Sequence, residues 1–161
     1  MHRPYSHCPR CGGRLSEAEG WPRRCGACDR YSYLSPAPAG VVLQPVDDGV
    51  LLIQRGIPPH RGAWALPGGF IDAHEGWREG VARELFEETG VVTAPDSLTL
   101  FSVESAPEDN MLLIFAVAPP LTASALPAFV ANKECRARRV ATAPEALAFA
   151  LHTAAVRRFL A

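Results

Sequence analysis

Residues 69–91 read GFIDAHEGWREGVARELFEETGV. Their second half, Trp77–Thr89, is predicted to be a helix, because good helix formers dominate it and a glycine follows where a C-terminal cap belongs. Glu84, Glu87 and Glu88 are spaced i, i+3, i+4 on this helix, which places three carboxylates on one side. Like charges at this spacing cost a few tenths of a kcal/mol per pair, whereas divalent cations would convert the repulsion into coordination. The pattern favours a metal site over a solvated acidic face.

The residues before the helix fit the same interpretation. Pro67, Gly68 and Gly69 carry little side-chain bulk, so backbone groups there can approach a metal or a phosphate closely. Arg83 lies one turn before Glu87, where an ion pair would hold that carboxylate in place. The loop and the helix therefore form one candidate site.

Residues 69–91 match the Nudix hydrolase signature at every fixed position: Gly-x5-Glu-x7-Arg-Glu-apolar-x-Glu-Glu-x-Gly-apolar. The stretch resembles a complete Nudix box, and residues 41–161 resemble a Nudix domain. This resemblance implies an α/β/α sandwich with a mixed sheet, and Mg²⁺- or Mn²⁺-dependent hydrolysis of a nucleoside diphosphate linked to another moiety. The metal-binding groups that it implies are the Gly69 carbonyl and the carboxylates of Glu75, Glu84, Glu87 and Glu88, with Arg83 as their orienting partner.

The general base is a separate question. Glu134 stands just before an expected strand, where related hydrolases often have a catalytic or metal-binding glutamate. Glu104 and Glu108 are alternatives in or near a loop. Each of these is also compatible with an ordinary surface carboxylate.

The N-terminal segment carries two cysteine pairs, Cys8-x2-Cys11 and Cys25-x2-Cys28. Four thiolates at this spacing can close on one tetrahedral Zn²⁺ with no open position, so the predicted role is structural. Disulfides are the competing interpretation, but thiols stay reduced in the cytoplasm, where we expect the chain to act because no signal peptide is visible.

The expected domains are a zinc ribbon over residues 1–35 and an α/β Nudix domain over residues 36–161, with the proline-rich stretch 31–40 as the connector. The fifth cysteine, Cys135, is expected to be a small buried hydrophobe. Strands are expected at 41–46, 50–55, 64–66, 91–93, 98–104, 111–118 and 135–141, and a second helix over 145–160.

The substrate is less constrained. A ribbon ahead of a Nudix box resembles the NADH pyrophosphatases, but their Ser-Gln-Pro-Trp-Pro-Phe-Pro segment is absent after this box. The overall plan is more similar to ribbon-bearing enzymes that cleave ADP-ribose and FAD. NAD(H) hydrolysis or NAD-cap removal, clearing of nucleoside triphosphates, and a nucleotide-sensing module without catalysis remain alternatives. Four aromatic residues are candidates for stacking on adenine, with core packing as the default: Trp64, Phe70, Trp77 and Phe101.

Charge and hydropathy exclude some partners. The formal net charge is −1, which gives no general attraction to nucleic acid. Prolines interrupt the uncharged stretch 111–131, so a membrane span is not expected there. The expected partner is a small nucleoside diphosphate substrate, and a homodimer is plausible by analogy.

Overall fold

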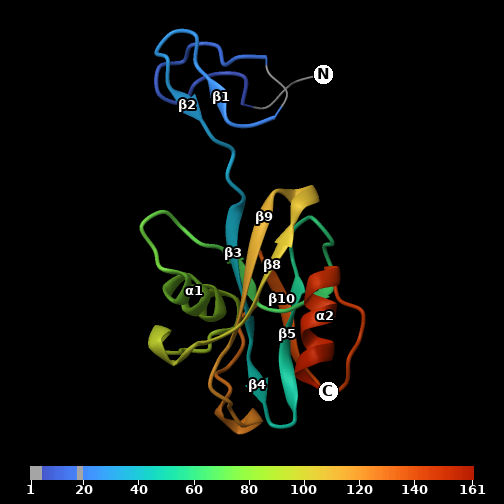
Figure 1. Cartoon of the computed structure of the whole chain (residues 1–161). Helices are drawn as coiled ribbons and strands as arrows, with labels where there is room; N and C mark the ends of the chain where they lie inside the picture. The colour runs from blue at the N-terminus through green and yellow to red at the C-terminus, as the bar shows by residue number, and fades with distance from the viewer. Residues whose placement is uncertain (1–4, 18–19) are drawn as a thin grey trace. The chain divides into compact units, whose positions relative to one another are not determined.

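The computed structural model describes residues 5–17 and 20–161. The chain forms two compact units, residues 1–36 and residues 37–161 (Figure 1). The first unit has a short antiparallel pair of strands, β1 (Arg23–Arg24) and β2 (Tyr31–Ser32). Its small buried cluster consists of two cysteines and a leucine: Cys8, Leu15 and Cys25. So little apolar surface stabilises a fold only weakly.

The second unit contains two four-stranded sheets. One sheet has the order β7-β3-β9-β8, with bounds Gly68–Phe70, Ala37–Leu43, Met111–Val117 and Thr99–Ala106. In the other, β5 (Gly49–Arg55) pairs with β10 (Cys135–Ala141), β4 (Pro45–Val46) and β6 (Trp64–Ala65). The β3–β9 pair is parallel and the neighbouring pairs are antiparallel, so the first sheet is mixed.

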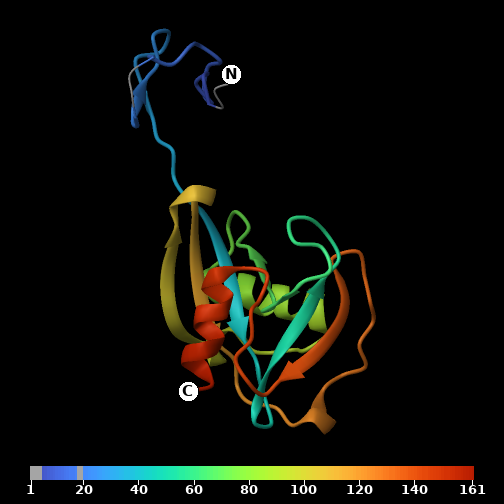
Figure 2. The same cartoon turned by 90° about the vertical axis from the view of Figure 1, so that its right-hand side faces the viewer.

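Two helices cover opposite sides of this arrangement, as Figures 1 and 2 show: α1 (Trp77–Thr89) and α2 (Ala150–Phe159). Three short 3-10 turns complete the unit: η1 (Pro95–Ser97), η2 (Pro107–Asp109) and η3 (Ala123–Ala125). Successive residues of β3 face opposite sides, as strand geometry requires. Val42 belongs to the same buried cluster as Val81 of α1, whereas Val41 belongs to the cluster that contains Val156 of α2. The expected α/β/α sandwich with a mixed sheet is confirmed.

Several element predictions are confirmed at residue level. Helix α1 has the predicted bounds, and Gly90 caps it with φ +77°, a conformation that glycine adopts without strain. Strand β10 also matches its predicted range. The predicted strand 41–46 is instead two pieces, since β3 starts at Ala37 and a break at buried Gln44 separates it from β4. The Gln44 side chain donates to two backbone carbonyls at this break.

Two element predictions are wrong. Residues 91–93 form no strand, because the Val91 amide bonds the Thr89 hydroxyl and the chain then turns into η1. The last helix begins at Ala150 rather than at residue 145. The residues before it are held outside the helix, since Glu145 pairs with Arg139 and the amide of residue 148 donates to residue 64.

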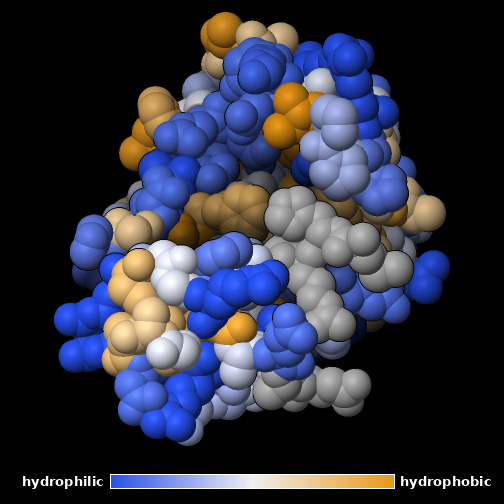
Figure 3. All heavy atoms as spheres, turned by 90° about the horizontal axis from the view of Figure 1, so that it is seen from above, coloured by the Kyte–Doolittle hydropathy of each residue, from blue (hydrophilic) through white to orange (hydrophobic). Residues whose placement is uncertain are grey.

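Among the described residues, no helix combines the length and the apolar character needed to cross a membrane. On the face shown in Figure 3, hydrophobic residues lie in small groups among hydrophilic ones. Such groups are normal for a protein surface.

Candidate active site

Arg83 is the centre of an ion-pair network on α1. Its Nε and Nη2 atoms each lie 3.0 Å from an oxygen of Glu75. Its Nη1 lies 2.8 Å from Glu84 Oε1 and 3.2 Å from Glu87 Oε2, and Nη2 also donates to the Phe70 carbonyl at 2.9 Å. One guanidinium therefore fixes three carboxylates and the end of the preceding loop. The fork of five donors makes arginine suited to this task, where lysine could not contact so many oxygens at once.

Glu84 lies against the backbone of Gly69. A Cβ atom added to Gly69 would be 2.4 Å from Glu84 Oε1, so a larger residue would collide with the carboxylate. Burial raises the pKa of Glu84, and the charges of Glu87 and Glu134 add to this while Arg83 opposes it. The glycine thus brings a backbone segment and a carboxylate into the close contact that a shared cation would use.

Glu88 is the most buried carboxylate of the three, with 7% of its surface exposed. Its Oε2 accepts a 2.8 Å hydrogen bond from the Gly68 amide. Burial raises the pKa of Glu88 to about 7. Gly68 has φ +153°, and a Cβ there would lie 2.2 Å from the Gly40 carbonyl oxygen, so only glycine fits. Cys135 is fully buried as predicted and contacts Glu88; burial first, and then this carboxylate, raises the pKa of its thiol.

The charge of this network is unbalanced. Three carboxylates share the single guanidinium of Arg83, those of Glu75, Glu84 and Glu87, and Glu88 lies one turn along α1 and bonds the Gly68 amide instead. Glu84 Oε2 and Glu87 Oε1 accept no hydrogen bond from any residue that the structure describes. The donor set of carboxylate and carbonyl oxygens, with excess negative charge, fits Mg²⁺ or Mn²⁺.

Glu134 lies in the loop that precedes β10 and is exposed. Its amide bonds the Asn132 side chain at 2.8 Å, and the Asn132 amide group donates to the Glu87 carbonyl at 3.0 Å. The loop is therefore attached to α1, and the negative charge of Glu134 contributes to raising the pKa of Glu84. Sequence reasoning missed Asn132, which nothing in its local pattern singles out.

The two alternative bases differ from Glu134 in their surroundings. Glu104 lies on β8 and pairs with Arg158 of α2 at 3.6 Å. Glu108 is exposed in η2. Neither contributes to the pKa shifts of the glutamates on α1, whereas Glu134 does.

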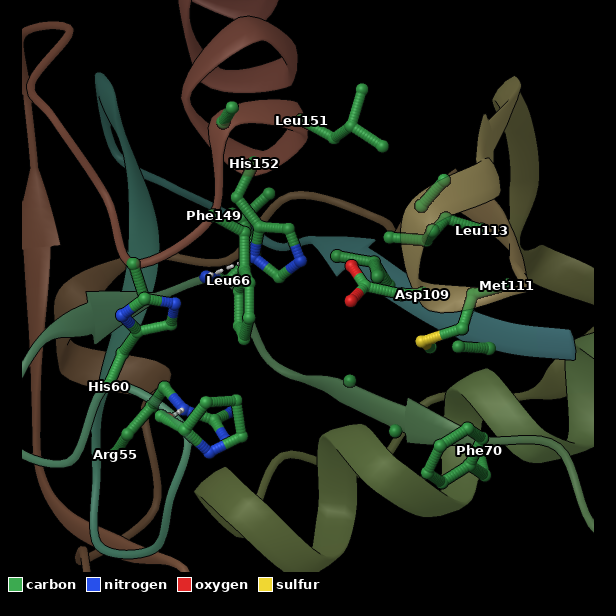
Figure 4. A pocket seen from close by; sticks show the side chains of 18 residues that line it. Arg55, His60, Leu66, Phe70, Asp109, Met111, Leu113, Phe149, Leu151 and His152 are labelled. Atoms are coloured by element: carbon green, nitrogen blue, oxygen red, sulfur yellow. Dashed lines mark hydrogen bonds between the residues drawn. The ribbon is translucent and has the colours of Figure 1, made fainter. Parts of the chain in front are cut away.

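A pocket of about 640 Å³ opens beside Gly68 and Gly69 (Figure 4). Apolar and aromatic side chains form most of its wall, including Phe149 at the N-terminus of α2. His152 of α2 and Asp109 of η2 contribute polar groups. Sequence reasoning missed all three of these side chains, because they come from segments far apart in the chain.

The four aromatic stacking candidates have different positions. Phe70 alone among them lines the pocket, and it is 57% exposed. The others pack against the two hydrophobic clusters of the core: Trp64, Trp77 and Phe101. Core packing therefore accounts for those three.

The four cysteines of the first unit converge. Their sulfur atoms all lie within 4.8 Å of one another, and among the described residues the glutamates of α1 are not part of so tight a group. The cysteines are free thiols rather than disulfides. Backbone amide donors lower the pKa of Cys8 to about 6 and lower that of Cys25 as well, which favours thiolates. The neighbouring Cys28 and Cys25 thiols raise the pKa of Cys11 despite a hydrogen bond from the Gly13 amide, so the convergence of the four sulfurs is the feature that suits Zn²⁺.

The chain is similar to known proteins at the levels of family, sequence and structure. A NUDIX domain model matches residues 35–161. The chain is 42% identical over 76 residues to an ADP-ribose pyrophosphatase of Methanocaldococcus jannaschii, covering 47% of this chain and 44% of that protein. It is 36% identical over 93 residues to an NAD-capped RNA hydrolase NudC of Vibrio parahaemolyticus, covering 56% of this chain and 35% of that protein. The matches span less than half the length of these curated relatives.

Solved structures resemble the chain over a larger share of its length. A NUDIX hydrolase from Nitrosomonas europaea aligns with a TM-score of 0.67 at 25% identity, covering 96% of this chain and 90% of that one. A MutT NUDIX hydrolase from Burkholderia pseudomallei aligns with a TM-score of 0.60 at 26% identity, covering 76% of this chain and 96% of that one.

Proposed function

The chain belongs to the NUDIX domain family, and from this premise we propose that it hydrolyses the pyrophosphate bond of an ADP-ribose-type or FAD-type nucleoside diphosphate derivative, releasing AMP. Mg²⁺ or Mn²⁺ is the proposed cofactor. One observation carries the proposal: a carboxylate cluster with excess negative charge, organised by Arg83, lies beside the glycines that border a ligand-sized pocket. A nucleotide in that pocket would extend its phosphates over the cluster.

We assign cation binding to the oxygens around the Gly68–Gly69 backbone: the Gly69 carbonyl and the carboxylates of Glu75, Glu84, Glu87 and Glu88. When bound, the cation would neutralise the diphosphate and lower the pKa of an attacking water. Arg83 holds Glu84 and Glu87 in position through bonds of 2.8 and 3.2 Å. The Gly68 amide orients Glu88.

Glu134 is our proposed general base. It is exposed, its backbone is anchored through Asn132, and its charge acts on Glu84, which supports a position at the edge of the cluster. A carboxylate there would accept a proton from the attacking water, and no covalent enzyme intermediate is needed.

The preference for ADP-ribose or FAD rests on similarity. The M. jannaschii relative is an ADP-ribose pyrophosphatase. The V. parahaemolyticus relative is an NAD-capped RNA hydrolase, which keeps NAD(H) hydrolysis or NAD-cap removal as the second candidate.

A panel of ADP-ribose, FAD, NADH and a nucleoside triphosphate, assayed with Mg²⁺ and with Mn²⁺, tests the activity. The products identify the substrate: AMP with ribose 5-phosphate, AMP with FMN, AMP with NMNH, or a monophosphate with pyrophosphate. We expect AMP from ADP-ribose or FAD, and none in the presence of EDTA. If no compound is cleaved with either metal, the hydrolase proposal is wrong and the non-catalytic alternative gains support.

For the first unit we propose a structural Zn²⁺ site formed by Cys8, Cys11, Cys25 and Cys28. The convergence of the sulfurs supports it. Gly13 permits the close packing of the two cysteine loops, since a Cβ there would lie 2.6 Å from the Ala27 methyl group and 3.2 Å from the Cys25 sulfur. With four protein ligands the ion has no open position, so its role would be folding of this unit rather than catalysis.

A further inference from the structure

The pocket beside Gly68 and Gly69 has the size of a small-molecule site. Its volume of about 640 Å³ falls within the roughly 300–1,000 Å³ that is usual for ligand pockets. Because it borders both glycines of the loop, a ligand whose phosphates lie against the carboxylate cluster can place its remaining part in the pocket.

His152 offers one hydrogen-bond donor to this pocket. Its Nδ1 accepts a 3.2 Å hydrogen bond from the Leu66 amide, so Nδ1 carries no proton and Nε2 does. The side chain is buried, with 6% exposed, and points into the pocket in Figure 4. No residue that the structure describes accepts a hydrogen bond from Nε2. A donor that faces the pocket and has no protein partner is available to a ligand that supplies an acceptor.

The orientation of this donor is fixed. The His152 ring lies edge-on to Phe115 with a centroid separation of 5.8 Å, and 4.9 Å from the Phe149 ring. Burial lowers the pKa of His152 to about 3, so the ring stays neutral and keeps one donor and one acceptor at ordinary pH. A fixed donor distinguishes ligands better than a rotating one, because a mismatched ligand leaves it unpaired.

The walls of the pocket suit a flat heterocycle. The Phe149 ring meets the His60 ring edge-on at 5.3 Å, and the Arg55 guanidinium lies 5.0 Å from the Phe149 centroid. Leu66 and Met111 add apolar surface. Aromatic and apolar walls favour a base over a sugar, whose hydroxyl groups would each need a partner.

Asp109 supplies the complementary polar group. In Figure 4 its carboxylate points into the same space as the His152 ring, from the opposite side of the pocket. An ionised carboxylate only accepts hydrogen bonds. His152 and Asp109 therefore present one donor and one acceptor, in a pocket that Arg55 and His60 also line. Adenine offers matching groups, since its ring nitrogens accept and its 6-amino group donates.

We propose that this pocket binds the base of the substrate and selects adenine over hypoxanthine, with His152 donating to a ring nitrogen and Asp109 accepting from the 6-amino group. This inference rests on the proposed function for the placement of the phosphates, and it adds the residues that determine specificity. Hypoxanthine carries a carbonyl oxygen in place of the amino group, so it would place two acceptors against each other at Asp109.

The test measures binding of AMP and of IMP to the full chain in EDTA, by titration calorimetry, so that no turnover is required. We expect AMP to bind at least about 10-fold more tightly than IMP, the factor that one hydrogen bond typically provides. Asp109→Asn is expected to bring the AMP/IMP affinity ratio close to one, because the new amide can donate to the carbonyl of IMP. Equal affinities for AMP and IMP in the unmodified chain would overturn the inference, as would an unchanged ratio in Asp109→Asn.

Two variants separate recognition by His152 from its structural role. His152→Asn keeps an acceptor for the Leu66 amide but lacks the Nε2 donor, and we expect about 10-fold weaker AMP binding. His152→Gln places an amide donor near the Nε2 position, and AMP affinity should remain within about threefold. Circular dichroism checks that both His152 variants are folded. If either is unfolded, the AMP/IMP affinity ratio of Asp109→Asn tests the inference instead. Equal losses in both variants with an unchanged AMP/IMP ratio would contradict a role in recognition.

The outcomes also separate this inference from the proposed function. If the chain cleaves ADP-ribose but binds AMP and IMP equally, base selection is wrong and the hydrolase proposal stands. If AMP is preferred but no compound of the panel is cleaved, the hydrolase proposal is wrong and the base site stands.

Discussion

Replacing Arg83 with alanine should destabilise the second unit substantially. The change leaves Glu75 and Glu84, whose side chains are 16% and 13% exposed, without their counter-charge. Removing one partner of a buried ion pair costs about 3–5 kcal/mol. Arg83 itself is 28% exposed, so the low end applies and we expect about 3 kcal/mol. At roughly 4 °C per kcal/mol for a domain of this size, Tm should fall by about 12 °C.

Differential scanning calorimetry in EDTA measures this loss. Arg157→Ala is the matched control, because it removes the same charge from an exposed position in α2 and should cost less than about 1 kcal/mol. Adding Mg²⁺ should return part of the lost stability, since a cation supplies positive charge to the same carboxylates. A Tm for Arg83→Ala that equals the control would refute the reasoning. The reasoning would also be refuted if neither Mg²⁺ nor Mn²⁺ changed the Tm of the unmodified chain or of the variant.

Glu87→Gln and Glu88→Gln should each abolish Mg²⁺-dependent cleavage of the panel substrates while the far-ultraviolet circular dichroism stays unchanged, and full activity in both would exclude their metal role. Because His152 is buried and neutral, the unfolding free energy should fall as the pH is lowered. The pKa of His152 is about 3 in the folded chain and 6.5 in the unfolded chain, so its contribution to the unfolding free energy is complete above pH 6.5 and is lost between pH 6.5 and 3. Glu88, whose pKa is raised, makes the unfolding free energy change with pH in the opposite direction. The quantity to follow by urea titration is therefore the difference in unfolding free energy between the unmodified chain and His152→Gln. This difference should shrink by about 1.4 kcal/mol per pH unit below pH 6.5, and a constant difference would contradict a buried neutral ring. Cys8→Ser or Cys25→Ser should release zinc, detected with a chromogenic chelator, and should lower the melting temperature of the first unit; a metal content equal to that of the unmodified chain would contradict the proposed site.

Local sequence patterns were sufficient where local forces determine the structure. Helix α1 follows from its helix formers and from Gly90, whose φ of +77° ends it. The same helix carries the fixed glutamate spacing, so Glu84, Glu87 and Glu88 follow from residue spacing, whereas Gly69 and Glu75 followed from the family resemblance. The close approach of Gly69 to Glu84 explains in physical terms why the motif requires a glycine there.

Tertiary contacts determined the features that the sequence did not predict. The stretch before α2 has helical periodicity, yet Glu145 bonds Arg139 and the Ala148 amide bonds the Trp64 carbonyl, so those residues stay outside the helix. The pocket combines η2, the loop before β6 and the start of α2. No local pattern marks His152 as a candidate, because a lone histidine on an apolar helix face is usually a core residue.

The hydrogen bonds at residues 66 and 68 have a practical consequence for protein classification. The Leu66 amide holds His152 near the end of the chain, and two residues later the Gly68 amide holds Glu88 within the motif. A short run of main chain thus connects the C-terminal helix with the carboxylate cluster. A truncated protein lacking that helix would retain the complete sequence signature of residues 69–91. It would lack His152 and therefore the hydrogen bond that holds the main chain at Leu66. Signature matching alone would therefore not report whether this anchor is present.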